Sequence, residues 1–448
     1  MATTYLQKVP SSVGSTTTAT FSFWVKIAGT GTQAIYTVHD GSAQFDIFVR
    51  NASGQVDFYG YNGSSFDFRL HTSRLLRDHN AWYHIVCKVD LTNSTQADRA
   101  ILYINGVRET AFSIETYPSN ASATAIFSKN STTTIGATHT GGSDLDGVLS
   151  HFHFCDGYAY DASTFGSTDA TTGEWKINTS PSVTYGTNGF FLFKDNASTT
   201  DQSGQGNNWS VTAGALVDTK DNPSNNFATS NVLDNGADKA PTFGNGNLTH
   251  SVGSSVWRFV ASTLGAHKGK FYSEIKIHSV SNNVMLGAGD RFDIDNNDMA
   301  YNAYPGGEPL GVGYLASNGN KYLNDNGTSY GNSYTANDII GVAMDIDNGF
   351  VYFSKNGVFQ NSGDPTSGAS GTGGIAFPST SSATGIKQFM PGLNNANISV
   401  NYGGGHFGVT AISTNSGNGY AGVEGDSKFN YQPPTGYAAL STKGLNYF

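Results

Sequence analysis

Two acidic stretches of the chain have the residue types of a calcium-binding loop. One is MDIDNGFVYFSKNGV, residues 344–358, and the other is DIDNND, which begins at Asp293. An EF-hand-type loop needs an oxygen ligand at position 5, glycine at position 6 and glutamate at position 12. Counted from Asp345, these positions hold Gly349, Phe350 and Asn356, and the stretch from Asp293 fails at positions 6 and 12. The sequence therefore argues against this type of calcium site at both places.

The stretch 344–358 fits β-hairpins better than a metal loop. Apolar residues alternate on both sides of Asn348-Gly349, which is the pattern of two strands with one buried face. Asn-Gly pairs favour two-residue turns because both turn residues need positive φ. A second pair, Asn356-Gly357, follows eight residues later, counted between the two asparagines. We therefore predict a β-meander with a two-residue turn at each pair.

Residues for catalysis are not arranged in a known pattern. Glycoside hydrolysis needs two carboxylates about 5–10 Å apart, and Asp57 and Asp67 stand alone on predicted strands. The glutamates form no such pair at strand spacing: Glu109, Glu115, Glu174, Glu274, Glu308 and Glu424. His151 and His153 share one face of a strand, which is either a solvent or interface face or a metal site shared between subunits. We expect no enzyme activity and no cofactor, although a carboxylate pair assembled from distant segments stays open.

The composition indicates a β protein. The 448 residues include 55 glycines, 12% aromatic residues and only 13% charged residues, with many Ser, Thr and Asn. Strands joined by tight turns have this composition, whereas long helices need stretches rich in Ala, Leu, Glu and Lys, and none is present. The fold class that we predict is all-β, with two antiparallel β-sandwich (jelly-roll) domains joined by an Asn/Gly-rich connector.

The charge and hydropathy patterns argue against several partners. The formal net charge is −10, and no basic cluster is present that would neutralise a run of phosphates, so we expect no nucleic acid partner. No apolar window is long enough to cross a bilayer, so we expect no membrane insertion, and we see no signal peptide. Cys87 and Cys155 lie in apolar runs and are either small buried hydrophobic residues or a disulfide between neighbouring strands.

Strand-like runs form two series separated by a stretch without periodicity. We predict a first domain over residues 1–217 and a connector over 218–247, partly ordered by Phe227 and Leu233. The second domain covers 248–410, and a C-terminal tail over 411–448 packs on this domain or on a neighbouring subunit.

The first series resembles the laminin G-like, concanavalin A-like jelly-roll domains. The stretches FSFWVKI, AWYHIVCKVD, AILYINGV and DLDGVLSHFHFCDG carry this resemblance. Some domains of this kind bind calcium through carboxylates and carbonyls at the rim of the sandwich. The resemblance therefore makes Asp144 and Asp146 candidate metal ligands, with a solvated acidic turn as the alternative.

The second series resembles a SPRY domain. GKFYSEIKI, DIIGVAMDIDNGFVYFSKNGV and FMPGL carry this resemblance. It implies that Asp345 is a hydrogen-bonded strand residue of the core.

A longer ordered set of stretches is similar to structural proteins of marine bacteriophages. The set contains DLDGVLSHFHFCDGYAYDASTFGSTDATTGEWKI, YGTNGFFLFKDNASTTDQSGQGNNWSV and DNPSNNFAT. The closing stretch YQPPTGYAALST is similar to the tail that follows the SPRY-like module in phage proteins. This resemblance implies a virion structural protein, first of all a tail-fibre or appendage component that binds a host-surface glycan or protein. The alternative is a capsid decoration or fibre protein with a purely packing role. Other virion structural proteins are the implied partners, and a homotrimer is the oligomer we expect first.

Loops rich in Asn and Tyr are the candidate contact surface. Aromatic rings stack on ligands and amides bond their hydroxyl groups without adding charge. The densest loops are 295–309 and 317–334, both in the SPRY-like series. Their candidate ligand-binding residues are Asp298, Tyr301, Tyr304, Tyr322, Tyr330 and Tyr334.

Overall fold

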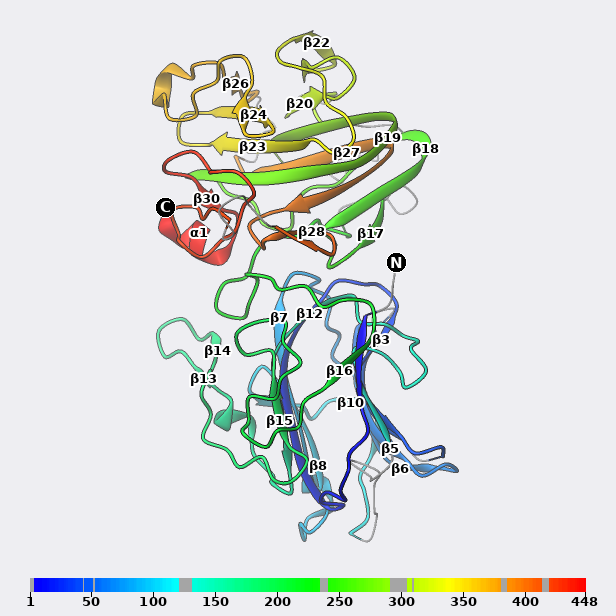
Figure 1. Cartoon of the computed structure of the whole chain (residues 1–448). Helices are drawn as coiled ribbons and strands as arrows, with labels where there is room; N and C mark the ends of the chain where they lie inside the picture. The colour runs from blue at the N-terminus through cyan, green and yellow to red at the C-terminus, as the bar shows by residue number, and fades with distance from the viewer. Residues whose placement is uncertain are drawn as a thin grey trace. The chain divides into compact units, whose positions relative to one another are not determined.

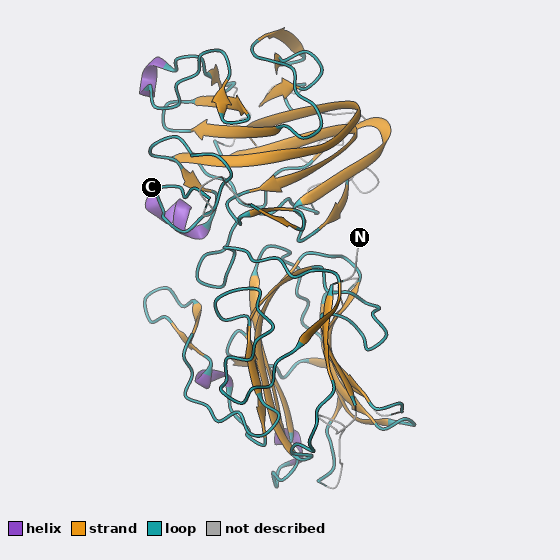
Figure 2. Cartoon of the chain, in the orientation of Figure 1, coloured by secondary structure: helices purple, strands orange, loops and turns teal. Residues whose placement is uncertain are grey.

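The computed structural model confirms the all-β prediction (Figures 1 and 2). It describes residues 4–448 except 43, 51–52, 121–130, 234–240, 291–303, 308–309, 380–384 and 413–418. The chain divides into two compact units, Met1–Leu216 and Val217–Phe448. Among the described residues, no helix is long and apolar enough to cross a membrane.

The first unit is a sandwich of two antiparallel sheets. The eight-stranded sheet has the order β10-β6-β5-β4-β3-β11-β1-β16, and the six-stranded sheet has the order β15-β12-β2-β7-β8-β9. The strands of the first sheet are β1 (Tyr5–Lys8), β3 (Thr32–His39), β4 (Gln44–Arg50), β5 (Gln55–Tyr61), β6 (Phe66–Thr72), β10 (Phe112–Thr116), β11 (Thr132–Ile135) and β16 (Ser210–Ala213). The strands of the second are β2 (Thr18–Ile27), β7 (Trp82–Asp90), β8 (Ala100–Ile104), β9 (Val107–Arg108), β12 (Gly147–Asp156) and β15 (Phe190–Leu192). A hairpin of β13 (Gly166–Thr168) and β14 (Trp175–Ile177) and two short 3-10 turns, Gln96–Asp98 and Ala162–Thr164, complete the unit.

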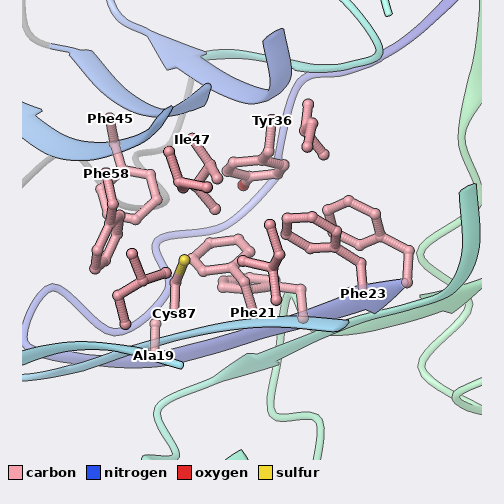
Figure 3. Close-up of a cluster of buried hydrophobic side chains, with 14 of the residues drawn as sticks. Ala19, Phe21, Phe23, Tyr36, Phe45, Ile47, Phe58 and Cys87 are labelled. Carbon is pink, nitrogen blue, oxygen red and sulfur yellow. The ribbon is translucent and has the colours of Figure 1, made fainter. Parts of the chain in front are cut away.

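Aromatic side chains fill the space between these two sheets. Figure 3 shows Phe45 and Phe58 of the eight-stranded sheet facing Phe21 and Cys87 of the six-stranded sheet. The ring of Phe21 also lies 4.5 Å from that of Tyr36, centroid to centroid. Because side chains alternate along a strand, the residues between these apolar ones point to the outer faces of the sheets.

Both cysteines are free and buried in the first unit. Cys87 belongs to the main core, and Cys155 packs in a smaller cluster with Val86 and Phe165. Burial raises the pKa of both thiols, so they stay protonated. Of the two interpretations that the sequence left open, the structure therefore supports two small buried hydrophobic residues.

The second unit is built around one long strand, β19 (Lys270–Asp290). β27 (Lys387–Asn401) pairs along one edge of β19, while β23 (Ile339–Asp345) and β20 (Gly311–Leu315) share the other edge. The remaining strands are β17 (Thr242–Gly244), β18 (Thr249–Phe259), β21 (Asn320–Leu323), β22 (Asn326–Ser329), β24 (Phe350–Lys355), β25 (Val358–Phe359), β26 (Ile375–Ala376), β28 (His406–Phe407), β29 (Thr410–Ala411) and β30 (Ala438–Ala439). A 3-10 turn, Gly368–Ser370, and the helix α1 (Thr442–Tyr447) are the non-strand elements. A second apolar core fills this unit.

The segments that precede and follow the second sandwich are hydrogen-bonded to each other. The N–H of Ala228 donates to the carbonyl of Leu440, and the N–H of Thr442 donates to the carbonyl of Asn226, both at 2.9 Å. Phe227 is buried with these segments. Part of the predicted connector therefore lies within the second unit.

Two Asn-Gly pairs form two-residue turns, and the pair at Asn356-Gly357 was predicted. Asn105 and Gly106 have φ of 49° and 77° between β8 and β9, and Asn356 and Gly357 have φ of 50° and 84° between β24 and β25. These positive values are those that an Asn-Gly hairpin turn requires.

The turn predicted at Asn348-Gly349 is instead a four-residue loop. β23 and β24 pair up to Asp345 opposite Phe350, so residues 346–349 form the loop. Within it, Gly349 has positive φ, and its N–H donates to the carbonyl of Asp345 at 2.9 Å. The carboxylate of Asp345 also accepts from the backbone N–H of Asn348 at 3.1 Å, which draws Asn348 inward and lengthens the turn. The prediction of a two-residue turn was wrong here.

Candidate functional site

Asp345 is held by protein donors. Its carboxylate accepts from the side-chain amide of Asn348 at 2.8 and 3.0 Å and from Lys270 Nζ at 2.7 Å, and the residue is fully buried. The structure thus confirms Asp345 as a hydrogen-bonded strand residue. The neighbouring Asp347 accepts from the N–H of Gly269 at 2.7 Å.

The candidate metal ligands Asp144 and Asp146 lie in the segment between β11 and β12. Asp144 is exposed and Asp146 is half-buried, and the backbone carbonyl of Asp146 accepts from the N–H groups of Ala28 and Gly29 at 2.8 and 3.2 Å. This backbone pairing fixes the segment to the end of β2. In the part of the chain that the structure describes, no three His, Cys, Asp or Glu side chains come together as a metal site.

Two of the candidate tyrosines lie in a polar-aromatic cluster of the second unit. Tyr304 and Tyr322 are half-buried, with ring centroids 6.2 Å apart, and Trp257 lies 5.3 Å from Tyr304. The hydroxyl of Tyr304 donates to the carboxylate of Asp325 in the β21–β22 turn. Asp298 and Tyr301, which were predicted with them, lie outside the described residues.

The other two candidate tyrosines are core residues. Tyr330 and Tyr334 are 5% and 3% exposed and belong to the main core of the second unit. The Tyr330 hydroxyl accepts from the N–H of Phe353 at 3.2 Å, and the Tyr334 hydroxyl donates to the carbonyl of Tyr314 at 2.6 Å. Their position in a surface loop was therefore predicted wrongly, because these hydroxyls find buried backbone partners and the rings turn inward.

The two histidines on one face of β12 are also buried. His151 and His153 are 8% and 2% exposed, and His153 Nδ1 lies 2.9 Å from the hydroxyl of Tyr185. The ring of Phe191 stacks on that of His153 at 3.9 Å between centroids. Residues of the same chain thus cover this face, so the predicted solvent or intersubunit face was wrong.

Ser22 and His84 meet on the side of the six-stranded sheet that carries His153, but the placement of the His84 proton leaves Ser22 without a general base. Ser22 Oγ lies 2.9 Å from His84 Nε2, and the indole N–H of Trp175 donates to His84 Nδ1 at 2.9 Å. Because an indole N–H can only donate, Nδ1 is the acceptor and the proton is on Nε2. His84 therefore donates to Ser22 and cannot accept its proton, as a general base must. Burial lowers the pKa of His84 to about 3, so the ring is neutral.

The outer face of the eight-stranded sheet carries a polar and aromatic cluster that the sequence did not reveal. Phe45, Ile47 and Phe58 point into the core, so their neighbours along the strands point outward. The strand register places Asp46 opposite Tyr59, Tyr59 opposite Arg69, and Asp57 opposite His71. We call these five residues together with Phe66 the outer-face cluster: Asp46, Asp57, Tyr59, Phe66, Arg69 and His71.

Asp57 and Arg69 form the charged centre of the outer-face cluster. Arg69 donates through Nε and Nη2 to the two oxygens of Asp57, at 3.1 and 2.7 Å. This bidentate geometry uses the guanidinium fork that would otherwise be available to an anion. His71 Nδ1 lies 3.4 Å from Asp57 Oδ1, and this nitrogen has no hydrogen-bond partner among the described residues although the side chain is only 9% exposed.

Asp46 has a different environment in the same cluster. Its carboxylate accepts from the Tyr59 hydroxyl at 2.5 Å, and Tyr59 is the one hydrogen-bond partner that the described residues provide. The pKa of Asp46 is raised to about 7, mainly by burial and also by the negative charge of Asp57. The hydrogen bond from Tyr59 acts in the opposite direction and lowers the pKa. A carboxylate has about four lone-pair positions, so Asp46 can accept further donors.

An exposed phenylalanine borders these carboxylates. Phe66 is 43% exposed, and its ring meets those of Tyr59 and Tyr61 edge to face at 5.3 and 5.4 Å. The guanidinium of Arg69 lies 4.8 Å from the centre of the Phe66 ring. Acceptors, a cation and an exposed aromatic residue thus occur together on one sheet face, a combination that suits contact with a sugar ring.

Comparisons with known proteins match the two units separately. Residues 2–163 match the family model of the concanavalin A-like lectin/glucanases superfamily, and residues 270–392 match the SPRY domain model. These matches support both resemblances seen in the sequence, one for each unit. None of the curated proteins compared with the chain matches it.

Solved structures that are similar to the chain include domains of both kinds. A human SPRY domain is 17% identical, with 34% of this chain and 89% of that chain covered and a TM-score of 0.25. The SPRY domain of human HERC1 is 15% identical over 34% and 87%, with a TM-score of 0.26. A heptameric SAP-like pentraxin from Limulus polyphemus is 17% identical over 43% and 85%, with a TM-score of 0.30.

Proposed function

We propose that the chain is a non-catalytic recognition protein of a bacteriophage virion, in which the outer-face cluster binds a glycan of the host surface. The observation that carries the binding part is the cluster itself, because it joins hydrogen-bond acceptors to an exposed ring on a sheet that fixes their spacing. The virion part rests on the sequence resemblance to phage structural proteins. Other virion proteins are the partners that this role requires.

Two observations support a role without catalysis. Asp57 is neutralised by Arg69 in a bidentate pair, which does not favour a role as nucleophile or general base. Ser22 is hydrogen-bonded to the protonated nitrogen of His84 and is not activated. Concanavalin A-like and SPRY domains are typically binding folds.

Removal of an exposed ring tests the proposal. Phe66→Ala removes an aromatic ring that is 43% exposed, and Tyr158→Ala is a matched control because Tyr158 is 40% exposed and lies outside the outer-face cluster. Loss of one stacking contact of about 1.4 kcal/mol corresponds to a tenfold weaker affinity. We expect the full-length Phe66→Ala protein to bind host cells and a glycan array about tenfold more weakly, and Tyr158→Ala to bind normally. Equal binding by both variants contradicts the proposal.

A second variant tests whether the second unit, and not the first, carries the binding. Tyr304→Ala disrupts the polar-aromatic cluster of Tyr304, Tyr322, Trp257 and Asp325. If Tyr304→Ala alone reduces binding, recognition belongs to the second unit and the outer-face cluster is not the site.

Exposed apolar residues on edge strands favour the packing role as a second candidate. Ile114 on β10 and Val211 on β16 are 41% and 42% exposed, and β10 and β16 are the two edges of the eight-stranded sheet. Such edges pair readily with other chains. Immunogold labelling of particles distinguishes the roles: label at the tail tip, with a trimer in solution, fits recognition, whereas label over the capsid fits packing.

A further inference from the structure

We propose that the outer-face cluster selects an uncharged, hydroxyl-rich sugar and rejects the corresponding sugar acid. This inference rests on the proposed glycan binding and adds the chemical class of the ligand. It follows from which charges of the cluster are already paired and which polar groups are left for a ligand.

The cation of the cluster is already engaged. Arg69 holds Asp57 through two hydrogen bonds, at 3.1 and 2.7 Å, and its guanidinium lies over Phe66. Recognition of a carboxylate by arginine normally uses the same two-pronged fork. A ligand carboxylate would therefore have to compete with Asp57, which is only 1% exposed and would lose this bidentate pair.

The groups that remain for a ligand suit hydroxyls. Asp46 accepts one hydrogen bond, from Tyr59, and its carboxylate can accept more. His71 is not left for a ligand, because its Nδ1 is buried and faces Asp57 Oδ1 at 3.4 Å. Sugar hydroxyls can donate to the Asp46 carboxylate. Phe66, which is 43% exposed, provides an apolar surface for the sugar ring.

Electrostatics disfavours a sugar acid at the same place. A ligand carboxylate near Asp46, which is only 5% exposed, would meet a like charge in a buried setting, where the repulsion is much stronger than in water. At pH 8 Asp46 is mostly ionised, because its pKa is about 7. The discrimination against an acidic sugar should therefore be largest at alkaline pH and smaller at pH 5, where Asp46 is protonated.

Asp46 has several titratable or charged neighbours on the face. They are His39 on β3, Asp57 and Tyr59 on β5, and Arg69 and His71 on β6. A pH effect is thus assigned to Asp46 only if Asp46→Asn removes it.

The test uses the full-length protein and pairs of oligosaccharides that differ at C6 alone. The probes are glucose, galactose and mannose oligomers, each beside its uronic acid counterpart, titrated calorimetrically at pH 8 and pH 5. We expect at least one neutral oligomer to bind and its uronate to bind at least tenfold more weakly at pH 8, with a smaller ratio at pH 5. Asp46→Asn should reduce the ratio at pH 8, whereas Asp169→Asn, which changes a half-buried acid in the turn between β13 and β14, should not.

The outcomes separate the two proposals. A uronate that binds as tightly as its neutral partner, or more tightly, overturns the inference and leaves glycan binding in place. A ratio that Asp46→Asn does not change, in a variant whose thermal melt matches the wild type, also overturns it. Absence of binding to every oligomer overturns the proposed glycan binding and the inference together.

Discussion

Replacement of Glu274 by glutamine tests how the second unit holds its C-terminal segment. Glu274 is fully buried, and its two carboxylate oxygens accept from the N–H groups of Asn430 and Tyr431, each at 2.7 Å. At pH 5 the Glu274 carboxyl is protonated, since its pKa is about 7, but its hydroxyl oxygen can still accept from an N–H group. The amide nitrogen that replaces this oxygen in glutamine cannot accept and is a donor that faces the N–H group. A buried donor without a partner costs about 1–3 kcal/mol. We therefore expect Glu274→Gln to destabilise the second unit by about this amount at pH 5.

The destabilisation should shrink as pH rises. Burial is the largest cause that raises the pKa of Glu274 from 4.5 to about 7, against the hydrogen bonds from Asn430 and Tyr431. Because the folded pKa lies above the unfolded one, the stability that this group contributes is present below pH 4.5 and is lost as pH rises through 7. Each difference of one in pKa is about 1.4 kcal/mol, so the loss between pH 5 and pH 8 is about 2–3 kcal/mol. Glutamine does not titrate, so the variant does not lose this stability as pH rises.

Trp257 makes the measurement specific for the second unit, because it is the only tryptophan after residue 216. Urea unfolding of the full-length protein labelled with 5-fluorotryptophan, followed by fluorine NMR, gives the free energy of unfolding at pH 5, 6.5 and 8. Glu174→Gln, at an exposed glutamate of the first unit, is the control. A destabilisation by Glu274→Gln that grows with pH would refute the reasoning, because it would show that the backbone N–H groups stabilise the ionised carboxylate more than burial penalises it.

Three further predictions concern the first unit. Cys87 and Cys155 are buried thiols with raised pKa values, so both should resist a thiol reagent in the native protein and react within minutes in urea, as followed by absorbance. Gly106→Ala places a Cβ at φ 77° and 2.3 Å from the Trp175 ring, and should lower the free energy of unfolding by about 1–3 kcal/mol and shift the Trp175 fluorescence. Phe58→Ala empties a fully buried core position and should cost about 3–5 kcal/mol in urea unfolding; a cost below 1 kcal/mol would contradict the packing described.

The fold could be predicted from the sequence because its signals are local. Alternation of apolar residues marks the strands, and Asn105-Gly106 and Asn356-Gly357 mark tight hairpins by their need for positive φ. The turn after Asp345 was predicted with the wrong length, because the Asp345 carboxylate binds a backbone N–H group of the loop. This contact depends on the position of Asp345 beside Lys270 in the folded protein, which cannot be read from the sequence.

The candidate site was harder to predict because it depends on strand register. Asp46, Asp57 and Arg69 lie on three successive strands, and only their pairing places the three side chains on one face in reach of each other. A usable signal was present: FDIFV, VDFYGY and FDFRLH each place a charged residue between apolar ones. Composition alone gave a wrong prediction for Tyr330 and Tyr334. They lie in an Asn-rich segment, which suggested a surface loop, yet both are buried in the core.

Hydrogen–deuterium exchange of the full-length protein with and without a bound host glycan tests the central claim most directly. We predict slower exchange in peptides from β4 to β6, residues 44–72, because the ligand lies over the outer-face cluster, and unchanged exchange in residues 304–334 of the second unit. Protection confined to residues 304–334, with residues 44–72 unchanged, would contradict the claim that the eight-stranded sheet is the recognition surface.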